Sequence, residues 1–428
     1  MQCWIISIGD ELLIGDTINT NASWMAQLLS EYGVEVERIV TLKDDLSVLK
    51  ETISDALDSV DLVISTGGLG PTHDDVTKTA VTDLFDTELI VHEPTLSFIK
   101  KTFKKRNIPF SKSNHLQAKV PADSEVLFNE QGTAPGLWLE KNNSILVVLP
   151  GVPYEMKHLM QKKVLPKLRK LLNGNVVRKA RYLLTSGIGE STLSDEVVGD
   201  LSSYFNENIS VAYLPSTQGT RIRVRARGSS EEDVENKMRP VIEHLKKSAG
   251  EYIVGEGKDL HLAKVLGELM TEKNLTMATA ESCTGGLLGS KVTDIPGSSR
   301  YMKGGIIAYA NEVKVKELDV EAEDLQKYGA VSKVVALQMA KGIAQKMGAD
   351  IGVSTTGIAG PEGGTREKPV GTVWIGFWNR DQHFAIKGEF TKDRWVNKER
   401  SVFVALEMVR RILLNISEMP YGLQKQTV

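Results

Sequence analysis

Apolar and polar positions follow two different periods along the first 172 residues of the chain. Strands are predicted at residues 3–8, 34–40, 61–65 and 144–149, and all but the second are short, mainly apolar runs. Between them, apolar residues recur at helical spacing, which predicts helices at residues 22–32, 46–58, 76–85 and 156–172. Strands that alternate with helices are typical of a doubly wound α/β domain, which binds ligands at the carboxyl ends of its strands. We therefore expect such a domain over residues 1–172.

Residues 175–255 have a different order of predicted strands and helices. Their pattern predicts strands at 180–185, 209–213 and 220–226 and helices at 190–204 and 231–249, in the order βαββα. Four arginines alternate along the last of these strands and so share one face: Arg221, Arg223, Arg225 and Arg227. That face fits contact with phosphate or RNA, but a charged alternation is more often the solvated side of a half-buried strand. We expect a small α+β domain that acts as a spacer or docking module.

A stretch rich in glycine and charge, GEGK at residues 255–258, is interpreted as the linker to a last domain over residues 258–428. Apolar periodicity there predicts helices at 261–273, 287–292, 331–347 and 395–416, with another that begins near residue 311. Strands are predicted at 275–278, 305–310, 351–355 and 370–378. This alternation again predicts an α/β domain, with a mixed sheet.

Composition narrows the class of protein. The 428 residues are 41% hydrophobic and 25% charged, as in soluble globular chains. Cys3 and Cys283 stand far apart in unlike contexts, which excludes a disulfide framework or a metal finger. The first strand is too short for a signal peptide, and no apolar run approaches the ~20 residues of a membrane span. With a net charge of −3 as well, we expect a cytoplasmic protein with no membrane association and no nucleic-acid partner.

The most informative stretch is TAESCTGG, residues 279–286, between a predicted strand and the first turns of a helix. Backbone N–H groups at a helix N-terminus form a natural anion site. Glu281, Ser282 and Thr284 add a carboxylate and two hydroxyls, and the paired glycines let a ligand approach the backbone. Ser282 is therefore a candidate nucleophile, with an ordinary helix N-cap as the alternative.

Amide chemistry at Ser282 would need a base. No histidine falls within the motifs of this domain, which argues against a Ser-His-Asp arrangement, and no Cys/His cluster indicates zinc. Lys314 comes one helical turn after the strand that ends at Tyr309, and a lysine that loses its proton near neutrality can activate a serine. Tyr309 can relay the proton, and backbone N–H groups at residues 283–286 can stabilise an oxyanion. Cys283 is the competing nucleophile, because thiols are intrinsically better nucleophiles.

A second ligand loop follows the third predicted strand and reads TGGLGPTHDDVT, residues 66–77. Its glycines let backbone N–H groups approach a phosphate. Asp74 and Asp75 repel a phosphate unless a divalent cation bridges them, and Asp10 and Glu11 of the first loop can add oxygen ligands. The alternative is a glycine-rich turn in which Asp75 caps the next helix.

Further motifs follow TAESCTGG in order: GSSRYMKGGIIAYANEVK (297–314), GAVS (329–332), TTGIAGPEGG (355–364), KPVGTVW (368–374) and a basic helix. This set closely resembles the nicotinamide-nucleotide amidohydrolase family, PncC, which forms the C-terminal domain of CinA proteins. The first half resembles the molybdopterin-binding domain at the N-terminus of CinA proteins. The middle module is similar to their KH-like domain, although it lacks a clear GXXG loop. The resemblance covers essentially the whole chain.

The resemblance favours Ser282 over Cys283 as the nucleophile. It implies a catalytic set of Ser282, Lys314, Tyr309 and Glu281. The substrate-binding set for the amidase is Thr284, Gly285, Gly286, Asn311, Thr356, Gly357, Ala359, Gly360, Arg394 and Arg400. In that set TGIAGP is expected to cradle ribose or phosphate. Arg394 and Arg400 are candidates for a nucleotide 5′-phosphate, or else are solvated helix charges.

In the N-terminal domain the resemblance implies that GTAPG (132–136) and LPGVPYEM (149–156) face the same pocket as the glycine loop. The nucleotide-binding set is then Gly67, Gly68, Gly70, Thr72, Asp74, Asp75, Asn19, Gly132, Pro150 and Gly151. A divalent cation is expected on Asp10, Glu11 and Asp75.

The family implies a bifunctional enzyme of pyridine-nucleotide recycling. Its C-terminal domain would convert nicotinamide mononucleotide to nicotinate mononucleotide and ammonia without a cofactor. Its N-terminal domain would hydrolyse ADP-ribose with a divalent cation. A competence or recombination accessory, or a molybdopterin-related binding protein, is the alternative. We also expect a homodimer.

Overall fold

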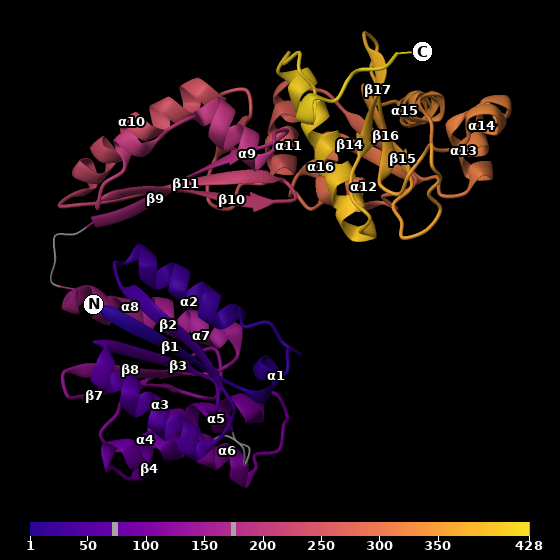
Figure 1. Cartoon of the computed structure of the whole chain (residues 1–428). Helices are drawn as coiled ribbons and strands as arrows, with labels where there is room; N and C mark the ends of the chain where they lie inside the picture. The colour runs from indigo at the N-terminus through magenta and orange to yellow at the C-terminus, as the bar shows by residue number, and fades with distance from the viewer. Residues whose placement is uncertain (71–75, 173–176, 428) are drawn as a thin grey trace. The chain divides into compact units, whose positions relative to one another are not determined.

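The structure, a computed structural model, describes residues 1–70, 76–172 and 177–427. They form two compact units (Figure 1). One holds Met1–Lys179 and Arg227–Val234, and the other holds Ala180–Ala226 and Glu235–Val428. No helix in these described ranges is long and apolar enough to cross a membrane.

The N-terminal unit is built on a six-stranded sheet in the order β2-β1-β3-β8-β7-β6. The strands are β1 (Gln2–Ile8), β2 (Glu35–Leu42), β3 (Leu62–Thr66), β6 (Glu125–Leu127), β7 (Gly136–Lys141) and β8 (Ser144–Leu149). The first four in this order pair in parallel. β3 and β8 are mainly apolar and are buried along their whole length, as expected for strands covered on both faces. β7 and β8 form a hairpin whose two linking residues, Asn142 and Asn143, both have positive φ.

Helices cover both faces of this sheet (Figure 1). One layer contains α2 (Thr20–Glu31), α7 (Pro153–Leu159) and α8 (Leu165–Leu171), and the other contains α3 (Leu46–Ser59) and α4 (Thr77–Phe85). The short α1 (Asp10–Leu13) follows β1 at the carboxyl edge. Beyond the sheet lie α5 (Glu93–Lys105), α6 (Lys112–Gln117) and the pair β4 (Leu89–Val91) and β5 (Lys119–Pro121). The predicted doubly wound N-terminal domain is confirmed.

The middle module has a four-stranded sheet in the order β10-β11-β9-β12. Its elements are β9 (Val177–Thr185), α9 (Glu190–Thr192), β10 (Ile209–Ser216), β11 (Gly219–Gly228), α10 (Glu231–Ala249) and β12 (Ile253–Glu256). The expected βαββα order therefore gains a final strand. The interpretation of residues 255–258 as a linker is wrong in its first half, because Gly255 and Glu256 pair with Leu184 and Leu183 of β9. These residues have the glycine-rich, charged composition of a linker because β12 is an edge strand, and an edge strand needs few apolar side chains.

The C-terminal domain has a five-stranded mixed sheet in the order β14-β13-β15-β16-β17. The strands are β13 (Met277–Glu281), β14 (Met302–Ile307), β15 (Ile351–Gly357), β16 (Thr372–Trp378) and β17 (His383–Glu389). One face packs against α11 (Leu262–Glu272), α12 (Leu287–Thr293) and α16 (Arg394–Leu413). The other packs against α13 (Asn311–Leu318) and α15 (Lys333–Met347), with α14 (Ala322–Tyr328) beside α15 (Figure 1). This confirms the predicted α/β class of the domain.

Candidate active site

Three neighbouring parallel strands of the C-terminal domain end at one place. Glu281, the last residue of β13, lies opposite Ile307 of β14 and Thr355 of β15. The chain stays anchored beyond these strands, because the Ser282 N–H donates to the Thr355 carbonyl at 2.8 Å and the Ala308 N–H donates to the Glu281 carbonyl at 2.8 Å. The three motif segments are therefore side by side at the carboxyl edge of the sheet, where α/β folds bind ligands.

Ser282 and Lys314 meet at this edge. The Lys314 Nζ lies 3.2 Å from the Ser282 Oγ, 2.7 Å from the Ala308 carbonyl oxygen and 3.2 Å from the Tyr309 carbonyl oxygen. Only 1% of the Lys314 side chain surface is exposed. Burial lowers the pKa of Lys314 from its ordinary value of 10.5, against the opposing influence of Cys283 and Glu312.

The three contacts of Lys314 can be made by either protonation state of its amine. A neutral amine has two N–H donors and one lone pair, whereas an ammonium has three donors and no acceptor. The carbonyls of Ala308 and Tyr309 can take both donors of the neutral amine. As an ammonium, Lys314 also donates to the Ser282 Oγ, 3.2 Å away; as a neutral amine it keeps its lone pair for the Ser282 hydroxyl, which is the arrangement that a general base needs.

Glu281 is a buried helix cap. Its side chain is 2% exposed, and its carboxylate accepts from the backbone N–H groups of Gly286, Leu288 and Gly289 and from the Thr284 hydroxyl. A carboxylate at this position satisfies the free N–H groups of α12 and complements the helix dipole. The structure therefore gives Glu281 a positioning task in the turn that carries Ser282.

The same bonds determine which N–H groups remain for an oxyanion. The Gly285 N–H donates to the Ser282 carbonyl at 3.1 Å, and the Gly286 N–H is held by Glu281. Among the described residues, the N–H groups of Cys283 and Thr284 donate to no oxygen, and both lie against the Cys283 sulfur, where they act to lower the pKa of that thiol. Of the N–H groups expected at residues 283–286, these two are available to a ligand.

Cys283 points into the core. It is 6% exposed and packs in the apolar cluster that contains α11 and α16. Burial raises the pKa of Cys283 to about 12, so the thiol keeps its proton near neutrality. A buried, protonated thiol is a poor nucleophile, and this favours Ser282.

Residues in the first turn of α16 hold the TGIAGP loop through hydrogen bonds to its carbonyl groups. The Arg394 guanidinium donates to the Gly360 carbonyl at 2.6 Å and to the Tyr309 hydroxyl at 3.1 Å. The Asn397 amide donates to the Ala359 carbonyl at 2.9 Å. Arg400, in contrast, lies near Tyr421, where its charge acts to lower the pKa of that phenol. The structure thus brings Arg394 to the site, whereas among the described residues no hydrogen bond joins Arg400 to it.

Most of the other predicted amidase residues lie around this edge. The Thr284 and Thr355 hydroxyls are 2.6 Å apart, and the Thr356 hydroxyl donates to the Ala330 carbonyl. Asn311 is exposed in the first turn of α13. Two further residues at this edge were not among those predicted from the sequence: Thr355, which contacts Thr284, and Lys398, whose Nζ lies 3.7 Å from the position of a β-carbon on Gly285. The signal for Lys398 was present, because it stands four residues after Arg394 and so shares its helix face.

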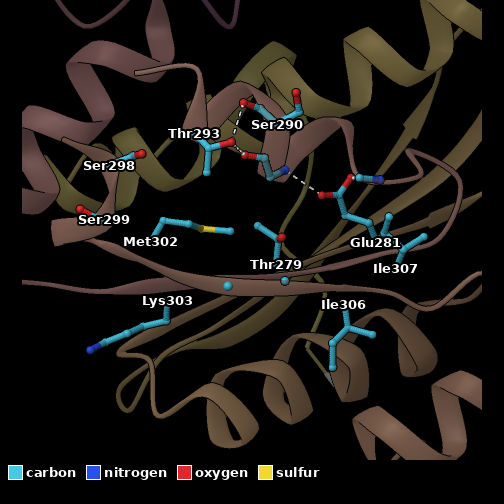
Figure 2. A pocket seen from close by; sticks show the side chains of 14 residues that line it. Thr279, Glu281, Ser290, Thr293, Ser298, Ser299, Met302, Lys303, Ile306 and Ile307 are labelled. Carbon is cyan, nitrogen blue, oxygen red and sulfur yellow. Dashed lines mark hydrogen bonds between the residues drawn. The ribbon is translucent and has the colours of Figure 1, made fainter. Parts of the chain in front are cut away.

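A pocket of about 460 Å³ lies beside the turn that carries Ser282, between α12 and the edge strand β14 (Figure 2). Ser290 and Thr293 of α12 line one wall, and Met302 with the strand glycines lines the other. Glu281 contributes to this pocket, and its carboxylate is bonded to the Gly289 N–H within it (Figure 2). Ser282 and Lys314 lie outside the lining.

In the N-terminal unit the predicted loops also converge at strand ends. The Thr66 hydroxyl donates to the Pro150 carbonyl at 2.9 Å, and the Asn21 amide donates to the Gly151 carbonyl at 2.7 Å. Gly67 has a φ of +110°, and a β-carbon there would come within 2.1 Å of the Ile8 carbonyl oxygen, so only glycine fits. Gly68 and Gly70 follow it in the loop, whereas Thr72, Asp74 and Asp75 lie outside the described residues.

Side chains around these loops have structural partners. The Asn19 amide oxygen accepts from the Ala22 N–H and caps α2. The Asn129 oxygen accepts from the Gly132 N–H, and its amide donates to Glu155 at 2.7 Å. Asn129 and Glu155 are both buried and hold the GTAPG loop in place. Asn21, Asn129 and Thr66 were missed because their contacts lie far away in sequence.

The expected cation site remains a prediction. Asp10 and Glu11 are exposed in α1, and Asp75 falls outside the described ranges. Within those ranges no three His, Cys, Asp or Glu residues lie close enough together to hold a metal ion. Asp10 and Glu11 alone supply too few oxygen ligands to hold a divalent cation.

Comparisons with known proteins agree with this division of the chain. The family profile "CinA C-terminal domain" matches residues 259–413, "Probable molybdopterin binding domain" matches 4–170, and "Damage-inducible protein CinA KH domain" matches 180–255. A "CinA-like protein" of Dictyoglomus thermophilum is 42% identical over 97% of this chain and 100% of its own. A "CinA-like protein" of Salinibacter ruber is 41% identical over 96% of this chain and 100% of its own length. A solved structure, competence/damage inducible protein CihA from Agrobacterium tumefaciens, is 40% identical over 36% of this chain and 93% of its own, with a TM-score of 0.35.

A molybdopterin-binding-like domain, a KH-like module and a serine–lysine α/β domain in one chain define a multidomain protein of the competence/damage-inducible class. The chain belongs to the CinA family. The resemblance to CinA proteins that the motifs indicated is thereby confirmed.

Proposed function

We propose that the C-terminal domain is a nicotinamide-nucleotide amidase that converts nicotinamide mononucleotide to nicotinate mononucleotide and ammonia. The observation that carries this proposal is the buried Lys314 amine within 3.2 Å of the Ser282 hydroxyl, at the ends of three parallel strands. This pair provides a nucleophile and a base without a metal ligand. The choice of substrate rests on the family resemblance of the surrounding motifs.

In the first half of the reaction, neutral Lys314 takes the hydroxyl proton while the Ser282 Oγ bonds to the amide carbon. The negative oxygen of the tetrahedral intermediate faces the N–H groups of Cys283 and Thr284. The Lys314 ammonium then returns the proton to the amide nitrogen, the C–N bond breaks and ammonia leaves. This step produces an ester between Ser282 and the nicotinoyl group.

Water completes the reaction. Neutral Lys314 takes a proton from the water as its oxygen attacks the ester carbon. Collapse of the second intermediate breaks the bond to the Ser282 Oγ, which regains its proton from Lys314, and the carboxylic acid product is released. Glu281 holds the turn throughout, and Tyr309 contributes its carbonyl to Lys314 and its hydroxyl to Arg394.

The test is the release of ammonia and nicotinate mononucleotide by the purified protein and its variants. Ser282→Ala should lose about three or more orders of magnitude in kcat, and Cys283→Ala should stay substantially active. Lys314→Ala should fall as far as Ser282→Ala, and the double variant should fall no further, because nucleophile and base act as one unit. Lys314→Arg should not restore activity. A dead Cys283→Ala beside an active Ser282→Ala would replace the serine mechanism with a thiolate one.

We also propose that the N-terminal unit binds a nucleotide and hydrolyses ADP-ribose with a divalent cation. This proposal is supported by the Asn21 side chain, which holds the Gly151 loop while its buried oxygen has no partner among the described residues. A ligand hydroxyl or N–H would satisfy that oxygen. ADP-ribose hydrolysis should require added Mg²⁺ or Mn²⁺ and be lost in Asn21→Ala and Asp75→Ala, while deamidation continues. Full hydrolysis of ADP-ribose in both folded variants would contradict this proposal.

We also propose that the protein is a homodimer. Sedimentation equilibrium of the purified protein tests this oligomeric state.

A further inference from the structure

A lysine from the closing helix approaches the nucleophile turn. Lys398 stands on α16, one turn after Arg394. Its Nζ lies 3.7 Å from the position that a β-carbon on Gly285 would occupy. Gly285 has a φ of +62° and carries no side chain, so the ammonium faces the backbone of the turn directly.

The other cations near the site have tasks of their own. Arg394 is bonded to the Gly360 carbonyl and the Tyr309 hydroxyl, and Lys314 is buried behind Ser282. Arg400 lies beside Tyr421. Lys398 is half-buried and has no acidic partner in the described part of the chain. Lys398 is therefore available to a substrate anion.

An aromatic side chain flanks this ammonium. The Lys398 Nζ lies 5.7 Å from the centroid of the Trp395 ring, and Trp395 is 58% exposed. A cation held against an aromatic face keeps its charge while it loses part of its hydration. A partly desolvated, unpaired ammonium binds an anion more strongly than a fully solvated one does.

We propose that Lys398 recognises the 5′-phosphate of the substrate and so makes the amidase selective for a phosphorylated mononucleotide over its nucleoside. This inference rests on the proposed amidase function. Lys398 comes from α16, whereas Ser282 follows β13 and Lys314 belongs to α13, so Lys398 is separate from the pair that reacts. Its contact is present in both the ground state and the transition state, so it should act on KM more than on kcat.

The experiment compares nicotinamide mononucleotide with nicotinamide riboside, which has the same ring and amide but no phosphate. Wild type should prefer the mononucleotide. Lys398→Met should raise KM for the mononucleotide by about tenfold or more, leave kcat within about threefold, and leave the riboside unchanged. Lys398→Arg should retain most of the preference. Lys341→Met, an exposed lysine of α15 on the other face of the sheet, is the matched control and should behave as wild type.

A binding measurement separates this inference from the amidase function. Calorimetric titration of nicotinamide mononucleotide into Ser282→Ala, with and without Lys398→Met, needs no turnover. Weaker binding only with the second substitution supports the assignment, even if wild type hydrolyses neither amide, in which case the proposed function alone fails. Equal affinity of both variants overturns the role of Lys398. An equal loss of activity toward mononucleotide and riboside overturns it as well, and indicates a role in the turn itself.

Discussion

Lys314 is a base only when it is unprotonated, and burial favours that form by lowering its pKa from 10.5. The rate of deamidation should therefore rise with pH and level off above the lowered pKa. Glu312, an exposed neighbour, raises this pKa by its charge. Glu312→Gln should thus move the rising limb of the kcat/KM profile to lower pH, and added salt should shrink the shift. Glu323→Gln, on α14, is the control. A shift to higher pH would contradict the assignment of Lys314 as the titrating base.

The same pKa has a consequence for stability. Between the lowered pKa and 10.5, the unfolded chain binds a proton that the folded chain does not. The free energy of unfolding contributed by Lys314 should therefore rise with pH through this window. Urea denaturation of wild type and Lys314→Met across the window measures the effect, and only wild type should show this contribution.

At the scale of single elements, α12 depends on the carboxylate that precedes it. Glu281 accepts three backbone N–H groups at the start of this helix. Glu281→Gln keeps the shape but puts an amide NH₂ against those donors, which should lower the free energy of unfolding by about 1–3 kcal/mol and reduce kcat. Urea denaturation measures the first and ammonia release the second. If Glu281→Gln keeps full stability but loses activity, Glu281 takes part in the chemistry directly.

The element boundaries show where the sequence was informative. The helix at 231–249 and the strand at 144–149 have the predicted limits, because each has a clean apolar period between turn residues. The helix predicted over 190–204 ends instead at Val198, since Gly199 with a φ of +71° terminates it. The strand β12 was missed because it depends on its partner β9. Local periodicity does not report such pairing.

At the scale of the whole molecule, the C-terminal end of α16 joins the C-terminal domain to the middle module. Glu407, Arg410 and Arg411 form a fully buried ion-paired cluster. Arg410 also donates to the Glu251 carbonyl, and Arg411 lies over the Tyr252 ring. The two domains therefore share one compact unit rather than meeting at a flexible linker.

This joint predicts the behaviour of fragments. A fragment of residues 177–428 should be about as stable as the same region in the intact chain and retain amidase activity. A fragment of residues 258–428 exposes Arg410 and Arg411 and removes their carbonyl partners, so it should melt at lower temperature or aggregate. Thermal melts and ammonia release of the two fragments provide the measurement. Equal stability would show that the cluster does not depend on the middle module.

The sequence by itself determined the fold class, the family and the serine–lysine pair. Strand–turn–helix junctions, glycines and the missing motif histidine are local signals, and they are visible without coordinates. Tertiary structure decided the task of each side chain at the site. Glu281 caps α12, and the Lys398 side chain points toward Gly285. The direction of a side chain depends on its position around the helix and on partners that are distant in sequence, so the sequence alone does not show it. It also decided that Cys283 is buried, and hence that its neighbour Ser282 faces the base. Burial is a property of the packed chain, and in this protein burial sets the pKa values on which the proposed chemistry depends.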